Sequence, residues 1–395
     1  MDESMITGLL DWPWWALVLY TLVTTHISII GITIYLHRQQ AHRALDLSPF
    51  VGHLLRFWLW LSTATVTREW VAVHRKHHAK VETEDDPHSP VVLGIWKVLL
   101  EGRELYHRAA HDIDTLKRYG HGTPEDWIER HLYSRHSYLG IYLLLALQLL
   151  LFGPIAITIW AVQLLWQPVF AAGIINGAGH FWGYRNFETA DASTNIVPWG
   201  VLIGGEELHN NHHAFASSAK LSSKPWEFDL GWIYIRALER MGLARVKKLP
   251  PSFVLRPEKS LPDVDTVKAV ISNRMQVMAR YARVVLRQVY RDELARCAAG
   301  ERPLLKGVHK LLVREESLLN ADARARLDEA LSRRQALKVV YLFRQRLQSI
   351  WKERSANYER LRDALEEWCT QAEASGIRAL QDFARTLPNY STQGA

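Results

Sequence analysis

The chain has 395 residues, of which 48% are hydrophobic and 23% charged, and its formal net charge is +7. These averages hide an uneven distribution, because residues 136–184 contain no Asp, Glu, Lys or Arg, while the C-terminal third is rich in charged side chains. The unevenness excludes a simple soluble globule, and the presence of only two cysteines excludes a disulfide framework and a thiolate metal cluster.

The first predicted membrane span covers residues 14–36, which carry no charged side chain. At ~1.5 Å per residue, a helix of this length crosses the ~30 Å hydrocarbon layer. No basic segment precedes it, so it is not a cleaved signal peptide. Acidic residues lie before it, and Arg38 and Arg43 follow it. We therefore expect the N-terminus outside and Arg38 in the cytoplasm.

Residues 50–67 form the next apolar segment, which contains His53 and Arg56. A charged side chain at the bilayer centre costs ~2.5–3.5 kcal/mol on insertion scales, so we expect a re-entrant or interfacial helix here. Two further spans are expected over residues 138–153 and 155–176, with a turn at Gly153-Pro154. The sequence thus predicts three spans, an outside N-terminus and a cytoplasmic C-terminus.

Polar inserts cover residues 68–136 and 185–250, and a proline-containing linker follows. The remaining chain has the apolar spacing of amphipathic helices, which predicts a small helical bundle or coiled coil. We expect an all-α integral membrane protein with interfacial helices and a cytoplasmic histidine-rich cap. Its predicted domains are residues 1–263 and a helical cytoplasmic C-terminal extension, residues 264–395.

The extension resembles the helical C-terminal end of insertion-sequence transposases around residues 336–384. It has no convincing acidic nuclease triad, and Glu and Asp interleave with its Arg residues. We therefore expect no nucleic-acid partner.

Histidines and one asparagine gather in four clusters along the first 214 residues. The clusters are His37 with His42, His74 with His77 and His78, Asn176 with His180, and His209 with His212 and His213. Residues three and four apart share a helix face, so one turn offers two or three imidazoles to one site. The five-residue step from His37 to His42 turns an α-helix by ~500°, so these two rings must serve different metals unless the helix bends.

Nine imidazoles without a cysteine or a carboxylate motif suit a pair of first-row transition ions. Zinc hydrolysis needs only three protein ligands and an activated water. The donor set therefore favours iron and dioxygen chemistry.

The same clusters resemble the histidine boxes of the membrane fatty-acid desaturases of the stearoyl-type Δ9 class. The resemblance covers residues 12–255 and extends to Arg68-Glu69-Trp70, Asp86-Pro87-His88-Ser89, His180-Phe-Trp-Gly-Tyr184-Arg185 and Glu207-Leu-His209-Asn-Asn-His-His213-Ala-Phe. The last phrase is closer to the acyl-lipid Δ9 enzymes of bacteria and plastids than to the animal acyl-CoA forms. Leu208 and Gly173 depart from tryptophans of the family, which leaves the chain-length preference open.

The resemblance implies a di-iron centre in which Asn176 holds a water near one iron. The implied iron ligands are His37, His42, His74, His77, His78, His180, His209, His212 and His213. It also implies a tunnel for a saturated acyl chain linked to phospholipid or CoA. Dioxygen and two electrons would remove two hydrogens, leaving a cis double bond. A separate ferredoxin, cytochrome or reductase would supply the electrons, because the chain has no His-Pro-Gly-Gly haem motif. The implied location is the bacterial inner membrane, with the active site facing the cytoplasm.

Several neighbouring side chains are candidates for supporting roles, and no catalytic residue is expected beyond the ligands. Trp70 would pack on the histidines or line the substrate site. The carboxylates expected to accept N–H bonds from ligand histidines are Glu69, Asp85, Glu206 and Glu207. The cations expected to meet a phosphate, meet an acidic electron carrier or simply set the topology are Arg38, Arg43, Arg68, Arg75 and Lys76.

Two alternatives remain open from the sequence. A related di-iron membrane hydroxylase would insert oxygen instead of removing hydrogen. A non-enzymatic membrane scaffold would bind no metal and leave lipids unchanged.

Overall fold

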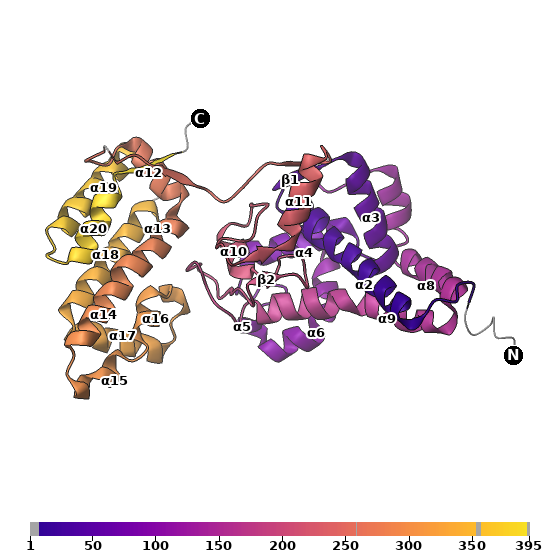
Figure 1. Ribbon diagram of the computed structural model, residues 1–395, viewed down its shortest axis with the longest axis horizontal. Coiled ribbons are helices and arrows are strands. Elements are labelled where there is room, and N and C mark those ends of the chain that lie inside the picture. Colours follow the sequence, from indigo (N-terminus) through magenta and orange to yellow (C-terminus); the bar gives the residue numbers. More distant parts are fainter. Residues whose placement is uncertain (1–7, 258, 353–356, 393–395) are drawn as a thin grey trace. The chain divides into compact units, whose positions relative to one another are not determined.

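The computed structural model describes residues 8–257, 259–352 and 357–392. They form two compact units (Figure 1). Unit 1 comprises the described residues up to Arg185 together with Asp191–Pro250, and unit 2 comprises Asn186–Ala190 and the described residues from Pro251 onward. Helices dominate both units, which confirms the expected helical class. The expected domain boundary between residues 263 and 264 stays a prediction.

Two helices of the described chain are long and apolar enough to cross a membrane, Trp14–Ala41 and Leu139–Ala178. The first consists of α2 (Trp14–Ile30) and the π-helix η1 (Gly31–Ala41). The second consists of α8 (Leu139–Phe152), η3 (Gly153–Ile155), α9 (Ala156–Trp166) and the π-helix η4 (Gln167–Ala178).

The second apolar helix folds back on itself at Gly153, whose φ is 68°. The Gln148 amide donates to Gln163 Oε1 over 2.9 Å, and the Trp160 indole donates to the Ile141 carbonyl over 2.9 Å. These bonds join residues on either side of the bend, so α8 and α9 form an apolar hairpin. The three membrane crossings themselves stay a prediction.

The segment expected at the interface forms α3 (Pro49–Thr63), whose start is capped by Ser48 accepting from the Val51 N–H over 3.4 Å. Arg56 on this helix is paired with Asp126 at 2.6 Å and with Glu129 at 3.4 Å. These carboxylates come from the polar insert and compensate the guanidinium, because an unpaired buried cation is costly. The pairing is compatible with an interfacial helix.

The remaining helices of unit 1 carry the polar inserts. They are α4 (Thr67–Lys80), α5 (Pro90–Leu93), α6 (Ile95–Ala110), α7 (Ile113–Tyr119), η2 (Glu129–Tyr133), α10 (His209–Ala214) and α11 (Leu230–Arg240). Short strands add two small sheets that the sequence analysis did not foresee. β1 (Leu45–Leu47) pairs antiparallel with β4 (Ala244–Val246), and β2 (Trp199–Gly200) pairs parallel with β3 (Phe228–Asp229).

A buried ion pair holds η1 to the last part of unit 1. Arg38 is fully buried, and its guanidinium donates to both oxygens of Asp229, at 2.8 and 3.2 Å. It also donates to the carbonyls of Ala219 and Gly204. Arg38 was expected to meet a phosphate, meet an acidic electron carrier or simply set the topology, and its polar contacts lie within the fold.

Unit 2 is a bundle of helices around its own core. They are α12 (Val264–Ser272), α13 (Arg274–Tyr281), η5 (Ala282–Leu286), α14 (Arg287–Arg296), η6 (Ala299–Glu301), α15 (Arg302–Leu305), α16 (Val308–Val313), η7 (Glu316–Leu318), α17 (Ala321–Arg333), α18 (Gln335–Lys352), α19 (Tyr358–Glu373) and α20 (Arg378–Thr386). β5 (Phe253–Leu255) pairs antiparallel with β6 (Tyr390–Thr392), which ties the two ends of the unit together.

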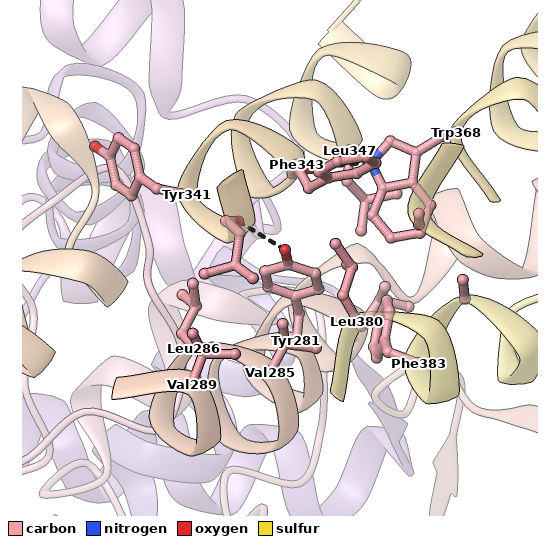
Figure 2. Close-up of a cluster of buried hydrophobic side chains, with 14 of the residues drawn as sticks. Tyr281, Val285, Leu286, Val289, Tyr341, Phe343, Leu347, Trp368, Leu380 and Phe383 are labelled. Carbon is pink, nitrogen blue, oxygen red and sulfur yellow. Dashed lines mark hydrogen bonds between the residues drawn. The ribbon is translucent and has the colours of Figure 1, made fainter. Parts of the chain in front are cut away.

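Aromatic side chains form the centre of this bundle (Figure 2). The Tyr281 hydroxyl donates to the Val340 carbonyl over 2.7 Å, and the Trp368 indole donates to the Phe343 carbonyl over 2.9 Å. Both polar groups are thus satisfied where they are buried, as a dry core requires.

Candidate metal centre

The structure brings the nine histidines of the four clusters together as two adjacent groups. Group A consists of His37, His42, His74, His78 and His212. Group B consists of His77, His180, His209 and His213. Within each group the candidate ligand nitrogens all lie within 4.8 Å of one another. The groups touch, because the rings of His78 in group A and His213 in group B are stacked with centroids 4.6 Å apart.

The π-helical form of η1 explains how His37 and His42 enter the same group. A π-helix bonds residue i to residue i+5, and the His42 N–H donates to the His37 carbonyl over 3.1 Å. The rings of the two residues are therefore on the same side, with centroids 4.8 Å apart. Of the two expected alternatives, separate metals or a helix that departs from regular α form, the structure has the second, because η1 is π-helical.

The helices α4 and α10 each supply both groups. On α4, His74 and His78 are four residues apart and belong to group A, whereas His77 belongs to group B. On α10, His209 and His213 belong to group B, whereas His212 belongs to group A. On each helix the i and i+4 histidines share one group, as the spacing predicts, and the i+3 histidine joins the other group.

The ring nitrogens in group A converge as ligands of one ion do. His212 Nε2 lies 3.1 Å from His37 Nε2 and 2.8 Å from His78 Nε2, and His42 Nε2 lies 2.8 Å from His74 Nε2. Ligands at right angles around an ion with metal–nitrogen bonds of ~2.1 Å are ~3 Å apart. Group A therefore fits a transition ion with imidazole ligands.

Group B has the same character. His180 Nε2 and His209 Nε2 are 3.0 Å apart. The Nε2 atoms of His77 and His213 are buried and have no hydrogen-bond partner among the described residues. An unpaired buried nitrogen is costly, and a metal ion held by the group would satisfy both atoms.

Burial lowers the pKa of the clustered imidazoles, and the neighbouring rings lower it further. This direction applies to His42, His74, His78, His180, His209 and His212. A lowered pKa favours the neutral imidazole, which is the form that binds metals.

Four carboxylates fix the orientation of four of the rings. His37 Nδ1 lies 2.8 Å from Glu206, and His77 Nδ1 lies 3.0 Å from Asp86. His180 Nδ1 lies 3.3 Å from Glu82, and His213 Nδ1 lies 3.0 Å from Asp191. A proton held on Nδ1 by a carboxylate leaves Nε2 free to bind a metal. The structure thus supplies the orienting partners that a ligand set needs.

Of the four carboxylates expected in this role, Glu206 contacts a histidine. Asp85 instead pairs with Lys80 at 3.0 Å, and Glu207 accepts the backbone N–H groups of Ile203 and Gly205. Glu69 lines the cavity described below. Asp86 was missed although it belongs to the quoted motif, and nothing in the sequence marks Glu82 or Asp191, which reach the site through the fold.

His88 is a buried residue beside group B that the sequence analysis left without a role. Its ring stacks on His77 with centroids 4.5 Å apart, and its backbone N–H donates to Asp86 Oδ1 over 3.1 Å. Burial lowers the pKa of His88 to about 3, so this ring is neutral. His88 therefore supports both the His77 ring and the carboxylate that orients it.

The other expected cations have contacts within the fold. Arg75 donates to four backbone carbonyls, including those of Gln40 and Ala41. Lys76 contacts Asp112 and Thr115, and Arg43 donates to the His121 carbonyl over 3.4 Å. Arg68 is exposed and lies beside Gly120.

A cavity of about 530 Å³ reaches from the histidines into the apolar hairpin. At one end it is lined by His37, His74, His209 and Asn176, and Trp70 lines it while stacking on His74 with centroids 4.9 Å apart. Its apolar walls include Ile141, Leu164, Leu165 and Ile175, and its polar lining includes Glu69, Arg103 and His107. This volume is in the range of small-molecule sites.

Two family models match the chain. The model described as "Fatty acid desaturase" matches residues 12–227, and the model described as "Transposase" matches residues 271–393, a longer stretch than the expected 336–384.

Curated relatives match the same N-terminal part. The chain is 31% identical to Delta-9 acyl-lipid desaturase 2 of Arabidopsis thaliana over 60% of this chain and 76% of the relative. It is 33% identical to the sn-1 stearoyl-lipid 9-desaturase of Anabaena variabilis over 56% of this chain and 79% of the relative. It is 30% identical to an acyl-CoA 5-desaturase of Anemone leveillei over 60% of this chain and 72% of the relative.

Proposed function

Because the chain belongs to the fatty acid desaturase family, we propose that it introduces a cis double bond at the Δ9 position of a saturated acyl chain. Its activity as a fatty acyl desaturase, an oxidoreductase of lipid metabolism, follows from the family and the relatives. The observation that carries the proposal is the pair of histidine groups at the end of a largely apolar cavity.

The proposed cofactor is a pair of iron ions, one in each group, with the nine histidines as ligands and Asn176 holding a water. When bound, iron supplies the redox chemistry with dioxygen that removal of hydrogen from a saturated chain requires. The chain's own carboxylates keep protons on Nδ1 of four rings, and Trp70 keeps the His74 ring in place.

The cavity is the proposed site of the acyl chain. Its apolar walls exclude water from the methylene groups, and Trp70 and Glu69 lie where a chain approaches the histidines. Relatives act on acyl-lipids and on acyl-CoA, so both carriers belong to the proposal. Arg68, exposed on α4, is the proposed contact for a carrier headgroup, and Glu207 is proposed to hold the loop before His209.

The proposed topology has three membrane crossings, with the metal centre on the cytoplasmic side of a bacterial inner membrane. The Anabaena relative supports a bacterial source, and the plant relatives are similarly close. A separate ferredoxin, cytochrome or reductase is the proposed electron donor, and no nucleic acid is expected to take part.

Expression in a host of defined lipid composition tests the proposed reaction. Gas chromatography–mass spectrometry of the host's acyl chains should show a new product lighter by two hydrogens, with its double bond at carbon 9. A product heavier by one oxygen would identify a hydroxylase instead. Unchanged lipids in a host that supplies iron and electrons would favour the scaffold alternative.

Replacing Asp86 with Asn is expected to weaken metal binding about 10- to 100-fold, because the His77 ring loses the carboxylate that orients it. The readout is metal retained per chain against a competing chelator. Asp85→Asn is the matched control, because the neighbouring Asp85 is exposed and contacts Lys80. Equal metal retention in both variants would contradict the role given to Asp86.

Labelling of introduced cysteines tests the position of α3. Asp46→Cys and Glu84→Cys flank the α3–α4 segment and are expected to react with an impermeant reagent from the same side of the membrane. Pro154→Cys at the tip of the hairpin should react from the opposite side. The natural Cys297 and Cys369 are buried, so they give little background. Opposite-side labelling at positions 46 and 84 would divide the histidine clusters between two compartments.

Removing residues 251–395 is expected to leave measurable desaturation, because all proposed ligands lie in unit 1. The measurements are metal content and product formation with a supplied electron donor. A truncated chain that inserts and retains metal but forms no product would assign unit 2 a part in turnover.

A further inference from the structure

One helical segment of unit 2 carries arginines along a single face. The segment consists of α13, η5 and α14, and Arg280, Arg283, Arg287 and Arg291 follow one another at steps of three, four and four residues. Such steps place side chains above one another on a helix. Tyr281, Val285 and Val289 are buried in the core, and we call the four arginines the arginine face.

Within the described parts of the chain, no carboxylate pairs with the arginine face. Residues 266–291 contain no Asp or Glu, and Arg283, Arg287 and Arg291 are exposed and form no ion pair among the described residues. Some exposed arginines elsewhere in unit 2 are paired, as Arg333 is with Glu329 at 3.1 Å and Arg385 with Asp382 at 3.7 Å. The face is therefore a concentration of uncompensated positive charge.

Lys310 on α16 and the composition of the C-terminal part add to this charge, whereas the lowered pKa of His309 favours its neutral imidazole. α16 packs beside η5, and burial together with the nearby Lys310 and Arg287 lowers the pKa of the His309 imidazole. Over residues 251–395 the chain has 26 Lys and Arg against 18 Asp and Glu, a net charge of +8, while residues 1–250 have a net charge of −1. The net positive charge of the protein thus resides in residues 251–395.

We propose that the arginine face binds the anionic phospholipid headgroups of the bilayer that holds unit 1. Four residues of helix rise ~6 Å, so Arg283, Arg287 and Arg291 extend over ~12 Å and reach several phosphates. A guanidinium matches a phosphate with two parallel hydrogen bonds. Near an anionic leaflet, three such cations strengthen binding roughly 100-fold.

The membrane anchor favours this partner over a dissolved polyanion. Because the same chain carries apolar helices long enough to cross the bilayer, the headgroups are always at high effective concentration, which a separate nucleic acid is not. Val284 lies between Arg283 and Arg287 and is 36% exposed, so an apolar contact accompanies the charges.

Fluorescence quenching in nanodiscs tests the proposal on the full chain. Val284→Cys is labelled with a fluorophore, and the discs contain phosphatidylcholine with or without phosphatidylglycerol, plus a lipid whose headgroup carries a nitroxide quencher. Quenching should be several-fold stronger with phosphatidylglycerol. It should fall in 1 M salt, where the screening length is only ~3 Å.

Two triple variants in the labelled chain separate this face from general charge. The first triple variant carries Arg283→Gln, Arg287→Gln and Arg291→Gln. It should lose the increase in quenching that phosphatidylglycerol causes. The second triple variant carries Arg333→Gln, Arg362→Gln and Arg385→Gln, which remove three arginines that contact carboxylates, and it should retain the response. All six side chains are exposed or partly exposed, and circular dichroism checks that both variants fold.

Equal quenching in the two lipids would overturn the proposal, and so would an unchanged response in the first triple variant. Duplex DNA that binds in neutral discs through the arginine face, without a phosphatidylglycerol response, would assign the face to nucleic acid instead. None of these readouts uses acyl turnover. Failure of headgroup binding is therefore distinguishable from failure of the desaturase proposal.

Discussion

Replacing His212 with alanine is expected to abolish desaturation and to remove one of two metal ions from the chain. His212 Nε2 lies within 3.1 Å of the Nε2 atoms of both His37 and His78, so it is central to group A. Loss of an orienting partner already costs 10- to 100-fold in affinity, and loss of a ligand costs more. Metal analysis and gas chromatography of the product measure both effects.

His131→Ala is the matched control for this substitution. The His131 ring is exposed, stacks on Trp127 and lies outside both groups. We expect the control to keep its metal content and activity. A His212→Ala chain with two metals and normal product would contradict the proposed ligand set.

Replacing Asp229 with alanine is expected to destabilise unit 1 by about 3–5 kcal/mol, because it leaves the buried Arg38 guanidinium without its counter-charge. Asp229 also accepts the backbone N–H groups of Leu221 and Trp232, which lose their partner as well. Arg38 directly follows the proposed ligand His37. Loss of the Arg38–Asp229 ion pair is therefore also expected to reduce the amount of metal that the chain retains. Thermal unfolding in detergent should show a midpoint lower by about 10 °C or more.

Asp46→Ala removes an ion pair of a different kind and serves as the control. Asp46 is partly exposed and contacts Arg245 and Lys247 on the surface. Such pairs contribute about 0–1 kcal/mol, so the midpoint should change little. If both substitutions lowered the unfolding midpoint equally, the stabilising role given to the buried Arg38–Asp229 pair would be contradicted.

The sharing of one group by the i and i+4 histidines of α4 and α10 was predictable because helix geometry determines it. The assignment of the i+3 histidines, His77 and His212, to the other group was not predicted, because the spacing places residues three apart on the same helix face as well. The presence of His37 and His42 in the same group was not predictable from their spacing. It depends on the π-helical turn of η1, which the residue spacing alone does not distinguish from an α-helix.

The orienting carboxylates were only partly predictable. Asp86 is near His77 in sequence, but Asp191 reaches His213 and Glu82 reaches His180 from loops that only tertiary structure brings together. The role of Arg38 was hidden for the same reason, since its partner Asp229 is remote in sequence. Local patterns identified the ligands, whereas long-range packing determined what supports them.

The fold, like the orienting carboxylates, was predictable only in part. Long stretches without charged residues predicted both apolar helices, and Gly153-Pro154 predicted the bend in the second. The spacing of apolar residues predicted amphipathic helices in unit 2. The short β1–β4 and β5–β6 pairs were missed, because three-residue strands carry too little pattern to detect. The desaturase assignment is confirmed by the family match, whereas the three crossings stay a prediction.

The number of iron ions in the purified, iron-loaded chain tests the central proposal most directly. Elemental analysis against protein concentration should give about two irons per folded chain, because group A and group B each converge on one site. A folded, active chain with one iron or none would contradict the paired metal centre.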